Sequence, residues 1–445
     1  MQYILPIICI FIFSVFDGSF SSFVYNSVIL ILGFIYTRRV EKPWRSDAIR
    51  ILSIVFPLYI GVAFVWSLSF TNGEHFYVID PVKYISEYIH SRSFDYNEER
   101  IYSFFINREG KDIVYVETLR VVSGLSNRFL GGMTVYCMTL IQTLFGVLSS
   151  ITLYQILCKY YKKDAYKYTL TFSCCSLFLM YSCLIIRDII IAYFFLEAIR
   201  IILGQFKLSN VFVLILLAFL AAGIRMMSGA FLGLFTMLYV YLATRRSKYG
   251  TFLTGIFVII AIILFSVVIS SVFYEDSIAE IEERQEHNME REAVTGGLYN
   301  FFFQLPVGIR QITIMLFSQI APFPPYGTLT RSENLVHFLM GLDVIIYELF
   351  WYMVSYTLML SLLIKKVYRY FTRSENYLLL LSFIFILALT AHPDIRRMMP
   401  VYPIIYILYL KSKHILQERW ITNVQKNMLM IYAILFFGYL LIKGF

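Results

Sequence analysis

The chain of 445 residues is 59% hydrophobic and only 15% charged, and its mean hydropathy is +0.69. Soluble domains carry about 25% charged residues, so the composition argues against a soluble domain and indicates a polytopic membrane protein. The formal net charge of +9 does not indicate nucleic-acid binding, because the basic residues lie mainly in short segments between apolar runs, where they set membrane orientation.

The N-terminus and the cysteines suggest neither a cleaved leader nor a metal centre. The first sixteen residues are apolar but lack a basic n-region and an A-x-A-like cleavage site, which predicts a retained first helix rather than a signal peptide. None of the six cysteines falls in a long polar segment, so we expect no disulfide framework and no thiolate metal site. We expect no metal and no cofactor.

Apolar runs of spanning or near-spanning length recur along the whole chain. They begin near residues 2, 23, 50, 130, 168, 189, 210, 226, 251, 338, 376, 400 and 427. We therefore expect an all-α fold in which residues 1–445 form a single transmembrane domain of about thirteen helices. Two long polar loops, about 71–128 and 275–336, interrupt the series.

Short basic segments between the runs fix the expected orientation. All of them fall at even-numbered ends of the passes, which the positive-inside rule assigns to the cytoplasm. They include Arg38, Arg39, Lys42, Arg45, Arg50, Lys159, Lys162, Lys163, Lys167, Lys207, Arg245, Arg246, Lys248, Lys365, Lys366, Arg369, Arg373 and the segment 411–426. Because both flanks of 168–203 and of 210–243 are basic, each must be a hairpin. Arg187, Asp188 and Arg225 therefore sit at outer turns, and both long loops lie outside.

Each long loop contains a stretch that suits the membrane surface. The first has aromatic and aliphatic residues at helical spacing after Pro81, which predicts an interfacial helix with Asp80 at its start. In the second loop, the acidic run 275–292 precedes an apolar stretch that carries Arg310 and is bracketed by prolines. This pattern favours a re-entrant or interfacial helix over two further passes.

Charged residues gather at the expected outer ends of the passes. They are Asp80, Arg187, Asp188, Arg225, His392, Asp394, Arg396 and Arg397. A guanidinium fork matches phosphate oxygens in a way that a lysine ammonium does not, and each charge-assisted hydrogen bond contributes about 1.5 to 3 kcal/mol. The pattern points to a lipid-linked phosphate or pyrophosphate as ligand.

A carboxylate near these arginines has a second possible role, as general base toward a sugar hydroxyl. The candidates are Asp80, Asp188 and Asp394, with His392 as a group that titrates near neutral pH. No P-loop, H-E-x-x-H or G-x-S-x-G motif is present, nor a D-x-D on an outer loop. Any group transfer must therefore draw its energy from an activated, membrane-bound donor.

The same residues also have plain structural readings. Arg187 and Asp188 suit a capped hairpin turn, with Asp188 at the N-terminus of the next helix, where a carboxylate complements the helix dipole. Arg225 suits an anchor to lipid headgroups, and Arg396 and Arg397 suit snorkelling to the interface.

The layout resembles that of the bacterial oligosaccharide repeat-unit polymerases of the Wzy and EpsG type, and more distantly that of the GT-C glycosyltransferases. The features that carry the resemblance are Asp80 with Tyr84, the run LIIRDIIIAYFFLEA around Arg187 and Asp188, Arg225 at the next hairpin, and a late R-x-x-P-x-x-P formed by Arg397, Pro400 and Pro403. Metal-dependent GT-C enzymes usually show an acidic pair in the first loop. Asp80 alone does not supply one, which favours the polymerase.

The resemblance implies glycosyl transfer at the periplasmic face of the bacterial inner membrane. A growing glycan on undecaprenyl pyrophosphate would be the donor and a repeat unit on a second carrier the acceptor, with a chain-length regulator as a conceivable further partner and no nucleic acid. The leaving pyrophosphate would be stabilised by Arg187, Arg396 and Arg397, with Arg225 in support. Asp80 or Asp394 would take the hydroxyl proton, and Asp188 would orient Arg187.

Two alternatives stay open. A GT-C transferase that uses a polyprenyl-phosphate donor would add one sugar instead of a ladder of repeats. A lipid-linked oligosaccharide flippase should carry cationic residues along the middle of several helices. The main charges away from the outer face are Glu197, Arg200, Asp343 and Glu348.

Overall fold

The computed structural model describes residues 4–68, 113–244, 335–389 and 398–443, together with 305, 306, 309, 312 and 313. The regular structure in these ranges is helical, without a strand. Four stretches within them are long and apolar enough to cross a membrane, as is typical of a membrane-embedded protein. They are Phe20–Thr37, Lys42–Ser67, Val135–Cys175 and Leu335–Leu363. The count of about thirteen passes stays a prediction.

Several predictions lie outside the described residues. They are the interfacial helix after Pro81, almost all of the loop 275–336, and the candidate site residues Asp80, His392, Asp394, Arg396 and Arg397.

Contacts within the chain divide it into two compact units. The first comprises Met1–Arg200, Gly223–Arg225 and Pro325–Phe350. The second comprises Ile201–Ala222, Met226–Pro324 and Trp351–Phe445.

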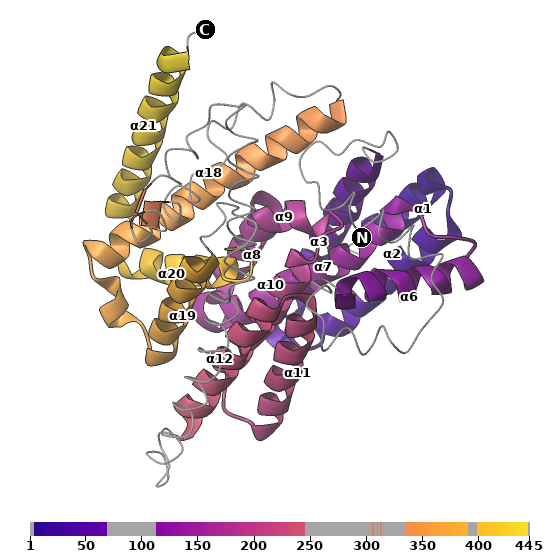
Figure 1. Ribbon diagram of the computed structural model, residues 1–445, viewed down its shortest axis with the longest axis horizontal. Coiled ribbons are helices and arrows are strands. Elements are labelled where there is room, and N and C mark those ends of the chain that lie inside the picture. Colours follow the sequence, from indigo (N-terminus) through magenta and orange to yellow (C-terminus); the bar gives the residue numbers. More distant parts are fainter. Residues whose placement is uncertain are drawn as a thin grey trace. The chain divides into compact units, whose positions relative to one another are not determined.

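Helix α7 is the central helix of the first unit. The helices of this unit are α1 (Ile4–Asp17), α2 (Phe20–Thr37), α3 (Arg45–Ser67), α6 (Ile113–Phe129), α7 (Val135–Tyr161), α8 (Ala165–Cys175), α9 (Leu177–Ser182), most of α10 (Asp188–Ile202) and the first part of α18 (Leu335–Leu363). Helix α7 packs against α2, α3, α8 and α9 (Figure 1). Its buried face is rich in small polar residues such as Thr139, Thr143 and Ser150, which let helices in a membrane approach closely and bond to one another.

Contacts near the two ends of α7 show how its neighbours run. Ser22 of α2 touches Cys137 near the start of α7, at 3.2 Å, and the hydroxyl of Tyr36 near the end of α2 lies 3.2 Å from the hydroxyl of Thr152. Helices α2 and α7 are therefore parallel. Helix α3 is antiparallel to both, because Tyr154, toward the end of α7, donates to the carbonyl of Trp44 just before α3 begins, at 3.4 Å.

The second unit contains α11 (Leu208–Ile224) as far as Ala222, α12 (Met226–Thr244), the rest of α18, the short 3-10 helix η4 (Val367–Tyr370), α19 (Arg373–Leu389), α20 (Tyr402–Ile415) and α21 (Glu418–Lys443). Its core is aromatic: Trp351 stacks on Tyr402 with ring centroids 4.1 Å apart, and Phe231 meets Phe385 edge-on. A buried ion pair between Lys411 and Glu375 joins α20 to the start of α19.

Each predicted apolar run outside residues 245–334 coincides with a described helix. Helix α6 was not predicted, because it falls in the expected outer loop 71–128. Its buried residues Tyr115, Leu119, Ser123 and Ser126 recur at helical spacing. The charged residues between them lower the mean hydropathy of this segment, so it was not recognised as a membrane-spanning helix.

Candidate functional site

The chain leaves helical structure between α9 and α10, at the Arg187-Asp188 pair. Helix α9 ends at Ser182 and α10 begins at Asp188. The four residues from Cys183 to Ile186 are all buried. Non-helical backbone at membrane depth is tolerated only where protein buries it or where it lines a cavity. The fold therefore surrounds this break with other helices instead of leaving it to lipid.

Hydrogen bonds fix both sides of the break. Thr143 of α7 donates to the carbonyl of Ser182 at 2.9 Å, and the thiol of Cys183 donates to the carbonyl of Tyr59 at 3.3 Å. On the other side, the amides of Ile190 and Ile191 donate to the carbonyl of Arg187 at 3.1 and 3.3 Å. Arg187 therefore caps α10.

Asp188 lies in the first turn of α10, where its carboxylate complements the positive end of the helix dipole. This is the capped turn that the plain structural reading of the sequence predicts. The turn also makes contacts that the sequence did not predict.

The turn between α11 and α12 meets the α9–α10 break. Nη2 of Arg225 lies 2.9 Å from Oδ1 of Asp188, and the two side chains are only 16% and 2% exposed. Nη1 of Arg187 donates to the carbonyl of Ile224 at 3.4 Å. One guanidinium thus pairs with the Asp188 carboxylate and a second contacts the adjoining turn, at the N-terminus of a 15-residue helix. Both the net charge of these three side chains and the helix dipole favour an anion.

Asp188 has a partner that the sequence did not predict. The role of orienting Arg187, its neighbour in the chain, stays a prediction. In the structure, the Asp188 carboxylate forms an ion pair with Arg225, because the α11–α12 turn brings Arg225 over the start of α10. The expected convergence with Arg396 and Arg397 lies outside the described residues.

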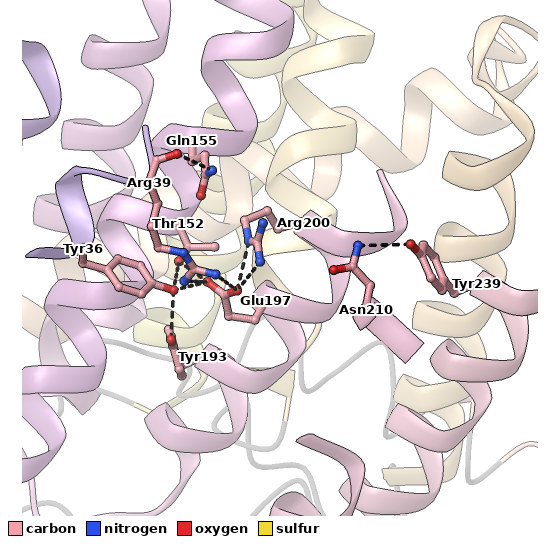
Figure 2. A network of polar contacts seen from close by, with 9 residues as sticks. All are labelled: Tyr36, Arg39, Thr152, Gln155, Tyr193, Glu197, Arg200, Asn210 and Tyr239. Carbon is pink, nitrogen blue, oxygen red and sulfur yellow. Dashed lines mark hydrogen bonds and ion pairs between the residues drawn. The ribbon is translucent and has the colours of Figure 1, made fainter. Parts of the chain in front are cut away.

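The α11–α12 hairpin that carries Arg225 is closely packed. A Cβ added at Gly229 would lie 2.5 Å from Cα of Ala222, so only glycine fits there without a shift of the backbone. At the other end of the hairpin, the Tyr239 hydroxyl accepts hydrogen bonds from the amide of Lys207 at 2.8 Å and from the side-chain amide of Asn210 at 3.1 Å (Figure 2).

A second polar cluster lies toward the C-terminal end of α10, around Glu197 (Figure 2). This carboxylate is 5% exposed and pairs with Arg200 at 2.8 Å and with Arg39 at 3.3 Å. It also accepts hydrogen bonds from Thr152 at 2.8 Å and from the hydroxyl of Tyr36. These partners come from α2, α7, α10 and the segment after α2, so the cluster stabilises the packing of three helices.

Arg39 completes this cluster just beyond the end of α2. Its guanidinium carbon lies 4.4 Å from the ring centroid of Tyr36, and its carbonyl accepts from the side-chain amide of Gln155 at 2.9 Å. Partial burial by itself lowers the pKa of the Arg39 guanidinium, but Glu197, Tyr36 and Tyr193 raise it, and the net direction is upward. Because donors surround the Glu197 carboxylate, the cluster has a structural role and stabilises the packing of these helices.

Among the residues that the structure describes, no group of three or more His, Cys, Asp or Glu side chains could hold a metal ion. Comparison of the chain with family models, with curated proteins and with solved structures found no match.

Proposed function

We propose that the chain is a membrane glycosyltransferase that polymerises lipid-linked oligosaccharide repeat units. The observation that carries this proposal is that two turns bring two guanidinium groups to the N-terminus of α10: Arg225 pairs with Asp188, and Arg187 donates to the carbonyl of Ile224. A site of this charge, on two turns between apolar helices, suits an anion that is itself attached to a lipid. The pyrophosphate of an undecaprenyl-linked glycan has this chemistry.

The reaction is a displacement at the anomeric carbon of the donor sugar. The terminal hydroxyl of the acceptor repeat unit attacks that carbon, and the bond from the carbon to the pyrophosphate oxygen breaks. Undecaprenyl pyrophosphate leaves with the bonding electron pair, and the hydroxyl proton passes to a base, for which Asp80 and Asp394 are the proposed candidates. Negative charge grows on the leaving group as the bond breaks, so preorganised guanidinium groups stabilise the transition state more than the ground state.

The geometry favours different roles for Asp188 and for the two arginines. Within the part of the chain that the structure describes, Nη1 of Arg225 is buried and has no hydrogen-bond partner, so a donor remains available for a phosphate oxygen. Asp188 is engaged by the other end of the same guanidinium. We therefore assign Asp188 the positioning of Arg225, and assign Arg187 and Arg225 to the leaving group, with Arg396 and Arg397 as further contributors.

The finer topology belongs to the same proposal. We place about thirteen passes in the bacterial inner membrane, with both arginine turns at the periplasmic face, where lipid-linked repeat units are joined. The ligands are two undecaprenyl-pyrophosphate-linked glycans, and a chain-length regulator is the proposed protein partner.

The test is to remove each guanidinium separately and to examine the surface glycan by gel electrophoresis. Arg187→Ala and Arg225→Ala should each reduce polymer at least tenfold, because each charge-assisted contact contributes about 1.5 to 3 kcal/mol and about 1.4 kcal/mol is a factor of ten in rate. Arg225→Lys should restore little, since an ammonium cannot contact Asp188 and a phosphate as a planar fork does.

Arg128→Ala is the matched control, because Arg128 is an exposed arginine at the end of α6, on the same predicted side and outside the cluster. All variants must be present in membranes at wild-type abundance by immunoblot. A normal ladder in both cluster variants would contradict the leaving-group role. A product that carries one added sugar instead of a ladder would indicate the GT-C alternative.

A further inference from the structure

Helix α18 has two unlike faces in its first half. The exposed residues on one side are all apolar: Leu335, Phe338, Leu339, Leu342 and Ile346. Their spacing of three and four residues makes one continuous stripe, as expected where a helix of 29 residues faces lipid. The buried stripe on the other side includes His337, Met340, Val344, Tyr347 and Glu348. The polar side chains of His337 and Glu348 are therefore buried within the protein.

Glu348 lies at the middle of this helix and is fully buried, with 0% of the residue exposed. Neither of its carboxylate oxygens has a hydrogen-bond partner among the described residues, and no charged side chain of that part of the chain acts on it. On α18 the nearest acidic residue is Asp343, and His337 lies three helical turns away on the same face as Glu348. Asp343 lies within electrostatic range of the thiols of Cys175 and Cys183.

An ionised carboxylate at this position would lose its hydration without gaining a hydrogen bond or an ion pair among the described residues. Burying an unpaired charge in this way has a very high free-energy cost. A neutral carboxylic acid avoids this cost. An ionisable residue at the centre of a membrane helix is expensive to bury and is by default a candidate functional group.

We propose that Glu348 is a proton-binding site in the interior of α18, where its side chain is held as a neutral carboxylic acid whose proton exchanges with the medium. The ligand is a proton and not a metal ion, because no group of three or more His, Cys, Asp or Glu side chains in the described residues could hold a metal ion. This site is separate from the arginine turns, and it does not rest on the glycosyl-transfer proposal.

Two other buried glutamates of the chain can be compared with Glu348. Glu197 and Glu375 are also buried glutamates, but each is paired with a basic residue: Glu197 with Arg200 at 2.8 Å, and Glu375 with Lys411. A nearby cation stabilises the ionised form. Glu348 combines full burial with the absence of a hydrogen-bond partner in the described residues, so no nearby cation stabilises its ionised form there.

Dicyclohexylcarbodiimide tests this directly, because it enters membranes and adds to protonated carboxyl groups but not to carboxylates. The full-length protein in native membranes is treated at neutral pH, and modified peptides are mapped by mass spectrometry. We expect modification at Glu348 and none at Glu197 or Glu375. Modification of Glu348 should decrease in alkaline medium, should not respond to Na⁺ or K⁺, and should vanish in Glu348→Gln.

Two results would overturn the proposal. The first is an unmodified Glu348 in native membranes under conditions that modify it in the chain unfolded in detergent at acid pH. The second is protection of Glu348 by Na⁺ or K⁺, which would make it a metal-cation site. A further readout is the melting temperature: Glu348→Gln should leave it unchanged, because an amide replaces an already neutral group, whereas a clear decrease would show that the Glu348 carboxylate has a stabilising partner and is not held as a neutral acid.

Discussion

Glu197 shows how one buried carboxylate can stabilise several helices. It accepts from Tyr36 and Thr152 and pairs with both Arg39 and Arg200. Glu197→Gln should lower the free energy of unfolding by about 3 kcal/mol, the lower end of the range for breaking a buried ion pair, because Arg39 remains partly in solvent and is screened there. Thermal unfolding of the purified protein in detergent measures the change.

The matched control for Glu197 is Asp47→Asn. Asp47 forms an ion pair with Arg50 at 3.4 Å in which both side chains are substantially exposed, so the same acid-to-amide change should cost about 0.5 kcal/mol at most. Equal losses in the two variants would contradict the structural role given to Glu197.

The residues differ in how far the sequence reveals their partners. The positions of the basic loops predicted that Arg187, Asp188 and Arg225 lie on the same side of the membrane. They did not predict which of these residues contact one another. The ion pair between Asp188 and Arg225 depends on how two turns approach in space, which no local pattern records. Glu197 was visible only as a charge away from the outer face, because its partners Tyr36 and Thr152 come from helices distant in the chain and look like ordinary apolar-run residues.

At the scale of elements, the α11–α12 hairpin determines where Arg225 lies. Gly229→Ala would place a Cβ against the backbone of Ala222, and backbone cannot move aside as a flexible side chain can. We expect a loss of about 1 to 3 kcal/mol in stability, typical of overpacking, and a reduced glycan ladder because Arg225 is displaced from Asp188.

Gly124→Ala is the control for this prediction, since a Cβ at Gly124 meets no atom within 4 Å. In helix α6 the change should stabilise by up to about 1 kcal/mol through helix propensity. Gly229→Ala with wild-type melting temperature and a wild-type ladder would show that the close packing of the hairpin does not position Arg225.

The elements themselves were predicted unevenly, for a physical reason. Runs of apolar residues indicate helices reliably because a chain in lipid must bond its own backbone. Helix α6 was missed because its buried side is one narrow stripe, and only the spacing of Tyr115, Leu119 and Ser126 would have revealed it. The break between α9 and α10 was predicted from the Arg187-Asp188 pair, whereas its burial follows from tertiary packing.

At the scale of the whole molecule, the relative directions of the helices fit the alternation of passes that the sequence predicts. Helices α2, α7 and α10 should all run from the outer face to the cytoplasm by parity of the basic loops. The contacts agree for α2 and α7, which are parallel, and Glu197 near the end of α10 meets Tyr36 and Arg39 at the end of α2. With 15 residues, α10 is about 22 Å long, shorter than the hydrocarbon core of about 30 Å.

This length predicts that Arg187 and Asp188 lie below the outer surface when Arg39 and Arg200 are at the cytoplasmic one, which explains why the fold buries and pairs them. Alkaline phosphatase, which is active only outside the cytoplasm, tests the direction when it is fused after residue 207 or after residue 225. The fusion after 225 should be active and the fusion after 207 inactive, because α11 separates the two positions. The reverse pattern would invert the topology and place both arginine turns on the cytoplasmic side, where the proposed periplasmic reaction could not occur.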